Sequence, residues 1–160
     1  MDAPASSPPL ALNAPLRDQR FGSLQDGELM IWSEEYSVDA GNIDTEHKDL
    51  FDAINDLQVA VVGHEDRESI GSLLIRVDEG THAHFTSEEA LMASVRYNGR
   101  ALHALKHQHL IEQIDAFVAR FHRGTDLNEH SLLFIRDWFI PHILEADKNF
   151  GHWFREHCLG

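Results

Sequence analysis

Apolar residues recur at a period near 3.6 along four stretches of the chain, which predicts four amphipathic helices. The second stretch is the longest, at roughly 28 residues by its period. Capping and helix-breaking residues bound the stretches. They are Asp44 or Thr45 as the first N-cap, an end near Gly63, a second end at Tyr97–Gly99, a third at Arg123–Gly124, and a last start near Leu127.

The chain before these stretches has no such period. Four of the protein's five prolines lie there, at positions 4, 8, 9 and 15, so we expect residues 1–29 to be a flexible leader. Residues 30–42 carry apolar side chains without a helical period, which predicts an extended arm anchored by Trp32, Tyr36 and Val38. With no strand signal, the sequence predicts an all-α antiparallel up-down-up-down four-helix bundle over residues 30–160, with an extended N-terminal arm.

Polar residues interrupt the apolar stripe of each predicted helix. His84 and Glu88 are four residues apart, so they lie about 40° apart around the helix axis and point the same way. His103 and His107 have the same spacing and form a chelating pair. A buried polar group needs a partner to offset its lost hydration, so these positions require an explanation.

The first and last helices contribute three more such residues, His47, His142 and Asp147. A regular helix separates His142 from Asp147 by roughly 140°. We therefore expect this pair to straddle the stripe and to clasp a wide cluster better than a single ion.

The seven groups are five imidazoles and two carboxylates, which favour iron, manganese, copper or zinc over an iron–sulfur cluster. Seven donors exceed the need of one ion, whereas two ions bridged by the two carboxylates use them all. Any one of these histidines, taken alone, is better explained as a core residue whose ring nitrogens form hydrogen bonds. The whole set without metal would cost far more than the roughly 5 to 15 kcal/mol of stability that a domain possesses.

Composition narrows the class of protein. The 160 residues include 12 histidines and one cysteine, Cys158, which alone makes neither a disulfide nor a thiolate site. The formal charge of −14 disfavours nucleic acids and anionic membranes as partners. We found no apolar run long enough for a membrane span and no signal peptide, so we expect a cytoplasmic protein without membrane insertion.

The other seven histidines lie off the stripe or near helix ends, and we expect them to be solvated or to interact with helix dipoles. His82 follows Glu79 in a single Glu-x-x-His pattern, which is weak evidence for a metal site because di-iron oxidases carry two copies. The remaining six are His64, His109, His122, His130, His152 and His157.

Four segments carry a likeness to a known family. They are Trp32 with Tyr36–Val38 and Ile43–Lys48, His84–Glu89 with Met92, His103–His107, and Trp138–Ile143 with Asp147. Together these segments, within residues 31–157, resemble the hemerythrin family in its bacterial single-domain form. All seven metal-binding positions of that family are matched in type, order and spacing.

The resemblance implies two non-heme iron ions, joined by an oxo or hydroxo bridge, with dioxygen as ligand. It assigns His103, His107 and His142 to one iron, His47 and His84 to the other, and Glu88 and Asp147 to both. The second iron keeps an open position for dioxygen, beside a pocket that we place at Trp138, Phe139 and Ile143. Phe139 stands where the family usually has leucine, and Pro141 adjoins a ligand.

The resemblance implies reversible dioxygen binding for carriage, storage or sensing, and no enzyme activity. Five neutral imidazoles favour reversibility, since di-iron oxygenases instead use four carboxylates and two histidines. No lysine or arginine falls on the ligand stripe as a proton donor. The alternative is a di-iron enzyme that reduces nitric oxide or peroxide, or a ferroxidase, and a protein partner that receives oxygen is compatible with either.

Overall fold

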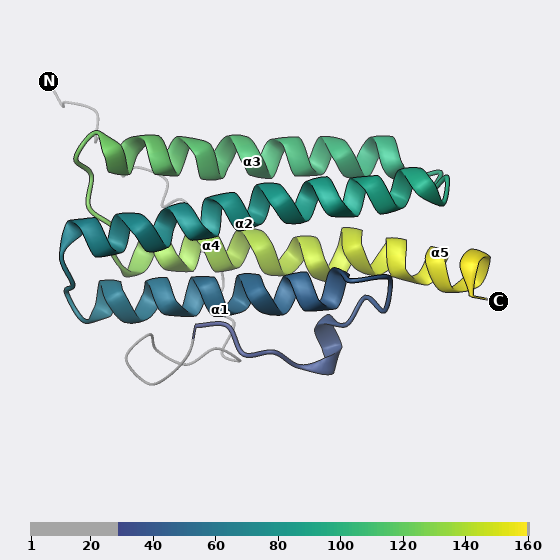
Figure 1. Cartoon of the computed structure of the whole chain (residues 1–160), viewed down its shortest axis with the longest axis horizontal. Helices are drawn as coiled ribbons and strands as arrows, with labels where there is room; N and C mark the ends of the chain where they lie inside the picture. The colour runs from purple at the N-terminus through teal and green to yellow at the C-terminus, as the bar shows by residue number, and fades with distance from the viewer. Residues whose placement is uncertain (1–28, 160) are drawn as a thin grey trace, which may run out of the picture.

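The computed structural model describes residues 29–159, and it is built from helices packed side by side (Figure 1). The last three helical segments run on from one another, so the chain forms four antiparallel rods. No strand occurs in the described residues, and the predicted four-helix bundle is confirmed. The helices are α1 (Ile43–Val62), α2 (Arg67–Ser94), α3 (Arg100–His122), α4 (Glu129–His142), a π-helical segment (Ile143–Asp147) and α5 (Lys148–Cys158).

Capping contacts mark several helix ends, including the predicted end at Arg123–Gly124 and the predicted start near Leu127. The side chain of Asp66 caps α2 by accepting from the Ser69 amide at 2.9 Å, and Gly124 adopts a φ of +108° just after α3. At α4, Asn128 and Ser131 form a reciprocal capping box. These features mark the start of α2, the end of α3 and the start of α4.

The predicted cap of α1 is wrong. The helix begins at Ile43, so Asp44 and Thr45 lie inside its first turn. The Asp44 carboxylate instead accepts hydrogen bonds from the Val38 amide at 2.7 Å and from the Ser37 hydroxyl at 2.6 Å. Asp44 therefore ties the N-terminal arm to the bundle.

The arm runs along α1 (Figure 1) and contains one short 3-10 turn, Glu34–Tyr36. Asn55 fixes its start by accepting from the Met30 amide at 2.9 Å and donating to the Met30 carbonyl at 2.8 Å. Trp32 and Tyr36 both pack edge-on against Phe51. Apart from Leu29, which is buried, the expected leader of residues 1–29 lies outside the described residues.

The core consists of two apolar clusters with a polar layer between them. One cluster fills the end of the bundle near the α1–α2 loop and includes Leu57 and Leu132. The other, at the opposite end, includes Met92 and Phe150. The rods that contain α1, α2 and α5 contribute to both clusters or link them, whereas α3 contributes only to the first. The buried imidazoles and carboxylates lie between the clusters.

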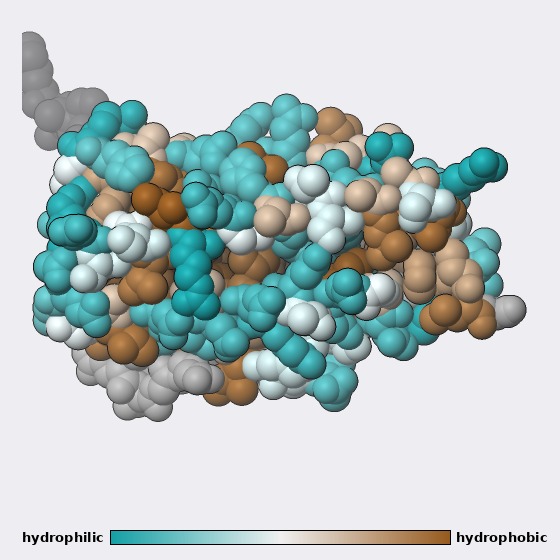
Figure 2. All heavy atoms as spheres, viewed as in Figure 1, coloured by the Kyte–Doolittle hydropathy of each residue, from teal (hydrophilic) through white to brown (hydrophobic). Residues whose placement is uncertain are grey.

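The surface is mixed, and the face drawn in Figure 2 is mostly hydrophilic with separate hydrophobic patches. None of the helices in the described part of the chain combines the length and the apolar character needed to cross a membrane.

Candidate metal centre

The polar layer brings together side chains from all four rods. Seven buried ligand-type residues meet there, and their donor atoms form two groups, each within 4.8 Å. The larger group contains Glu88, His103, His107, His142 and Asp147, and the smaller contains His47, His84 and Asp147. These are the seven residues that the sequence analysis singled out.

Asp147 belongs to both groups because its two oxygens face different histidines. Its Oδ2 lies 3.1 Å from Nε2 of His47. Its Oδ1 lies 3.0 Å from Nε2 of His103 and 2.9 Å from Nε2 of His142. One carboxylate thus spans the two sets of imidazoles.

Glu88, on α2, stands beside a second set of imidazoles that shares only His103 with the set around Asp147. Its Oε2 lies 3.2 Å from Nε2 of His107 and 3.6 Å from Nε2 of both His84 and His103. Glu88 therefore reaches histidines of both groups, as a bridging carboxylate must.

The backbone next to His142 differs from the expected regular helix. His142 ends α4, and the five residues that follow, up to Asp147, form a π-helical segment. A π-helix pairs residues five apart, so it places Asp147 on the same face as His142 rather than about 140° away. The expectation that this pair straddles the stripe is wrong, because the helix between them is not regular.

Many of the donor atoms lack a hydrogen-bond partner in the described part of the protein, which is what a metal-binding cluster requires. Both oxygens of Glu88, both oxygens of Asp147 and Nε2 of His103 are buried without a hydrogen-bond partner among the described residues. Nε2 of His47 faces Nε2 of His84 at 2.9 Å, and a single proton at most can lie between two such nitrogens. Unpaired buried groups of this kind are costly, and bound cations would satisfy them.

Electrostatics in the metal-free protein lead to the same conclusion. Burial lowers the pKa of His103, but the carboxylates of Asp147 and Glu88 beside its Nε2 raise it to about 9. Burial raises the pKa of Asp147, yet the imidazoles of His142, His103 and His47 bring it well below its ordinary value of 3.8. The cluster therefore holds carboxylates in their anionic form, the form that binds cations.

Two further carboxylates, which the sequence analysis did not assign, contact histidines of the cluster at Nδ1, the ring nitrogen that faces away from the other donors. Glu46 Oε2 lies 2.8 Å from Nδ1 of His84, and Glu89 Oε1 lies 2.8 Å from Nδ1 of His107. A carboxylate that accepts from Nδ1–H fixes the tautomer that leaves Nε2 free for a metal. Glu46 also accepts from the Ser87 hydroxyl at 2.6 Å.

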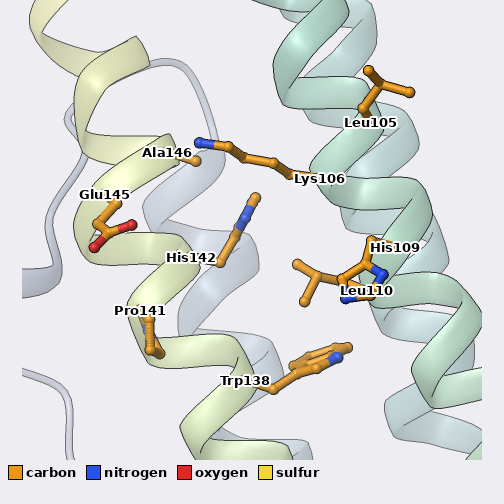
Figure 3. A pocket seen from close by; sticks show the side chains of 9 residues that line it. All are labelled: Leu105, Lys106, His109, Leu110, Trp138, Pro141, His142, Glu145 and Ala146. Carbon is orange, nitrogen blue, oxygen red and sulfur yellow. The ribbon is translucent and has the colours of Figure 1, made fainter.

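The residues proposed for an oxygen pocket lie in two environments. Phe139 and Ile143 are buried in the apolar core, and the Phe139 ring stands edge-on to His47 with centroids 5.8 Å apart. Trp138 instead lines a surface cavity of about 430 Å³ between α3 and α4, which reaches His142 (Figure 3). Figure 3 shows Lys106 extending from α3 toward Ala146 across this cavity.

Most of the other histidines lie at the surface, as expected. His157 stacks on Trp153, and Nδ1 of His152 lies 2.8 Å from the Arg155 guanidinium. His82 is partly exposed, and its ring contacts Asp78 and Asp115 rather than Glu79.

A four-helix bundle with a buried histidine and carboxylate cluster is the architecture of a non-heme metalloprotein. The family model described as hemerythrin HHE cation binding domain matches residues 39–158. The chain belongs to the hemerythrin family. Membership supports oxygen binding at a di-iron site in general terms, and the cation-binding description agrees with the donor cluster.

Individual relatives agree with this assignment. A bacteriohemerythrin of Methylococcus capsulatus is 33% identical over 126 residues, which cover 77% of this chain and 95% of that protein. Myohemerythrin-1 of Phascolopsis gouldii is 28% identical over 120 residues, which cover 75% and 90%. The crystal structure of a wild-type hemerythrin superposes with a TM-score of 0.73 at 32% identity, over 77% of this chain and 95% of that one.

Proposed function

We propose that this protein binds dioxygen reversibly at a di-iron centre held by its seven buried donors. One iron takes three imidazoles, the other takes two, and two carboxylates bridge the irons. In that order the residues are His103, His107 and His142, then His47 and His84, then Glu88 and Asp147.

The observation that carries the proposal is the double orientation of Asp147. Its Oδ1 faces two imidazoles of the three-histidine group, while its Oδ2 faces His47 of the two-histidine group. A carboxylate in a single-ion site has no need to present its two oxygens to separate groups of imidazoles. The arrangement favours two ions with a shared bridge.

When bound, two ferrous ions supply electrons and an open coordination position for dioxygen, and the protein determines how that chemistry proceeds. Glu46 and Glu89 orient His84 and His107 through their Nδ1 atoms. The Phe139 and Phe51 rings, with centroids 6.0 Å apart, place apolar surface beside His47 and exclude water from that side.

The donor set favours binding over oxygen activation. Five imidazoles are neutral ligands, and among residues 29–159 Glu88 and Asp147 pair with imidazoles and with no lysine or arginine. No lysine or arginine of the described residues therefore stands at these carboxylates as a proton donor to assist cleavage of the oxygen–oxygen bond. A cytoplasmic location and a protein partner that receives oxygen stay predictions.

Stopped-flow mixing of the anaerobically reduced, iron-loaded protein with dioxygen, followed by evacuation, tests the proposal. We expect a charge-transfer spectrum to form and then to return to that of the reduced protein. Permanent oxidation on the first exposure would overturn reversible binding. Sustained turnover with nitric oxide, peroxide or ferrous ion would instead identify an enzyme.

A further inference from the structure

A second cluster of ligand-type side chains lies outside the polar layer. It combines Asp78 and His82 of α2 with Asp115 of α3, and their donor atoms lie within 4.8 Å of one another. His82 precedes His84 by two residues, about 200° around the helix, so it points away from the buried centre. It also lies about 9 Å along the axis from Glu88, six residues away.

The distances suit a metal ion. Nε2 of His82 lies 2.9 Å from Oδ1 of Asp115 and 3.4 Å from Oδ1 of Asp78. A tetrahedral zinc ion with bonds of 2.0–2.2 Å holds its donor atoms about 3.3 Å apart. His82 therefore stands near ligand spacing from both carboxylates, and all three donor atoms lie within 4.8 Å of one another.

One oxygen of Asp78 is buried without a hydrogen-bond partner in residues 29–159, which indicates that a ligand binds there. Its Oδ1 is buried without a hydrogen-bond partner among the described residues, although the side chain as a whole is partly exposed. Burial raises the pKa of Asp78, His82 lowers it, and Asp115 raises it further, with a net increase. Two carboxylates crowd one imidazole, so a cation would relieve both their repulsion and the unsatisfied oxygen.

No lysine or arginine of the described residues competes with an ion for these two carboxylates. In the described part of the chain, neither Asp78 nor Asp115 forms an ion pair with a lysine or arginine. The nearby Arg76 of α2 is paired with Asp56 of α1 instead. The side chains of His82 and Asp115 are 43% and 52% exposed, so water can complete the coordination of an ion from outside.

We propose that Asp78, His82 and Asp115 form a second metal site, which binds one divalent first-row transition ion such as Zn²⁺. One imidazole and two carboxylates, with water in the remaining position, are a donor set that zinc accepts. The i and i+4 spacing on α2 provides a chelating pair, and α3 adds the third ligand. The site is independent of the di-iron centre, because it shares no residue with it.

Calorimetric titration of the full-length, iron-loaded and oxidised protein with Zn²⁺ tests this proposal. We expect one zinc ion to bind per chain while the iron absorption stays constant. His82→Gln and Asp115→Asn should each weaken zinc binding by more than about tenfold, since even residues outside a coordination shell are worth that much. His130→Gln, which removes an exposed histidine from α4, should leave zinc binding unchanged.

Three results would overturn the second site. They are the absence of zinc binding to the wild-type chain, equal zinc affinity in the His82→Gln and His130→Gln variants, and zinc uptake that occurs only as iron is lost. Circular dichroism shows whether each variant keeps its helices. Because Asp115 is exposed and asparagine is nearly isosteric with it, Asp115→Asn keeps the proposal testable even if His82→Gln perturbs packing.

Discussion

His142 and Asp147 are five residues apart, yet Nε2 of the first lies 2.9 Å from Oδ1 of the second, because the helix between them is π-helical. The extra residue in that turn lets one rod present both side chains to the polar layer. Pro141, which has no amide hydrogen to donate, immediately precedes His142. The irregular backbone therefore coincides with the centre, as π-helical turns often do at functional sites.

The bridging role of Glu88 predicts unequal losses of iron. Glu88→Ala should remove both irons, because its carboxylate holds the two ions together, whereas His47→Ala should leave iron on the three-histidine group. Iron per chain, measured after gel filtration under anaerobic conditions, distinguishes the two variants. Equal iron content in both would count against the bridge.

Glu46 and Glu89, which contact Nδ1 of two histidines, should strengthen iron retention. Glu46→Gln weakens the acceptor for Nδ1 of His84, so we expect iron to be held about 10 to 100 times less tightly. Asp49→Asn, at an exposed position of the same helix, is the matched control and should retain iron normally. Competition with a ferrous chelator measures both, and similar retention in the two variants would remove Glu46 from the account.

Iron binding should release a proton. With a pKa raised to about 9, His103 is protonated in the metal-free protein at pH 7.5, and a metal can bind only the neutral imidazole. We expect about one proton from His103 per chain on anaerobic Fe²⁺ addition at pH 7.5, and none from it well above pH 9. A pH indicator in weak buffer reports the release, and a yield that does not change across this range would contradict the assignment.

The same pKa shifts set the stability of the metal-free bundle. The raised pKa of His103 contributes stability that is complete below 6.5 and is lost as pH rises through about 9. The lowered pKa values of Glu88 and Asp147 contribute stability above their ordinary values of 4.5 and 3.8, which is lost as pH falls. Urea unfolding should therefore show greatest stability between these limits, and a profile that keeps rising to pH 9 would exclude the charged imidazole.

Phe139 should slow the movement of dioxygen and water near His47. Phe139→Leu should speed dioxygen binding and release and shorten the life of the oxygenated protein, with iron content unchanged. Phe134→Leu, on the exposed side of the same helix, serves as the control. Kinetics like those of the wild type in the Phe139→Leu variant would show that the ring is only a core residue, and Phe139→Ala would add about 3 to 5 kcal/mol of cavity cost.

The arm should depend on Asn55. Asn55→Ala leaves the buried Met30 amide and carbonyl without their partner, so we expect a loss of about 1–3 kcal/mol in the free energy of unfolding. Asp52→Ala, on the exposed face of α1, should change it by less than about 0.5 kcal/mol. If urea unfolding gives the same free energy of unfolding for both variants, these hydrogen bonds do not hold the arm.

The period of apolar residues predicted the four rods because each rod buries one continuous stripe. It could not predict the π-helical turn, since a 3.6-residue period has no means of registering one extra residue between His142 and Asp147. It also misassigned Asp44, whose carboxylate is equally suited to cap a helix or to bind the arm. Only the position of the arm in space decides between these roles.

The sequence picked out the seven donors because each is a polar residue on an otherwise apolar stripe. Glu46 and Glu89 lie off that stripe and directly beside other donors in the sequence, so they resembled solvated residues. Their partners, His84 and His107, belong to other helices. The pairing of Asp115 with His82 was hidden for the same reason, because cross-helix contacts leave no pattern along one chain.

The most direct test of reversible binding at two irons is to count dioxygen taken up and returned by a chain of known iron content. The account predicts about two irons per chain, uptake of about one dioxygen by the reduced protein, and recovery of nearly all of it under vacuum over repeated cycles. An oxygen electrode and iron analysis of the same sample provide both numbers. One ion per chain, or dioxygen consumed without return, would contradict it.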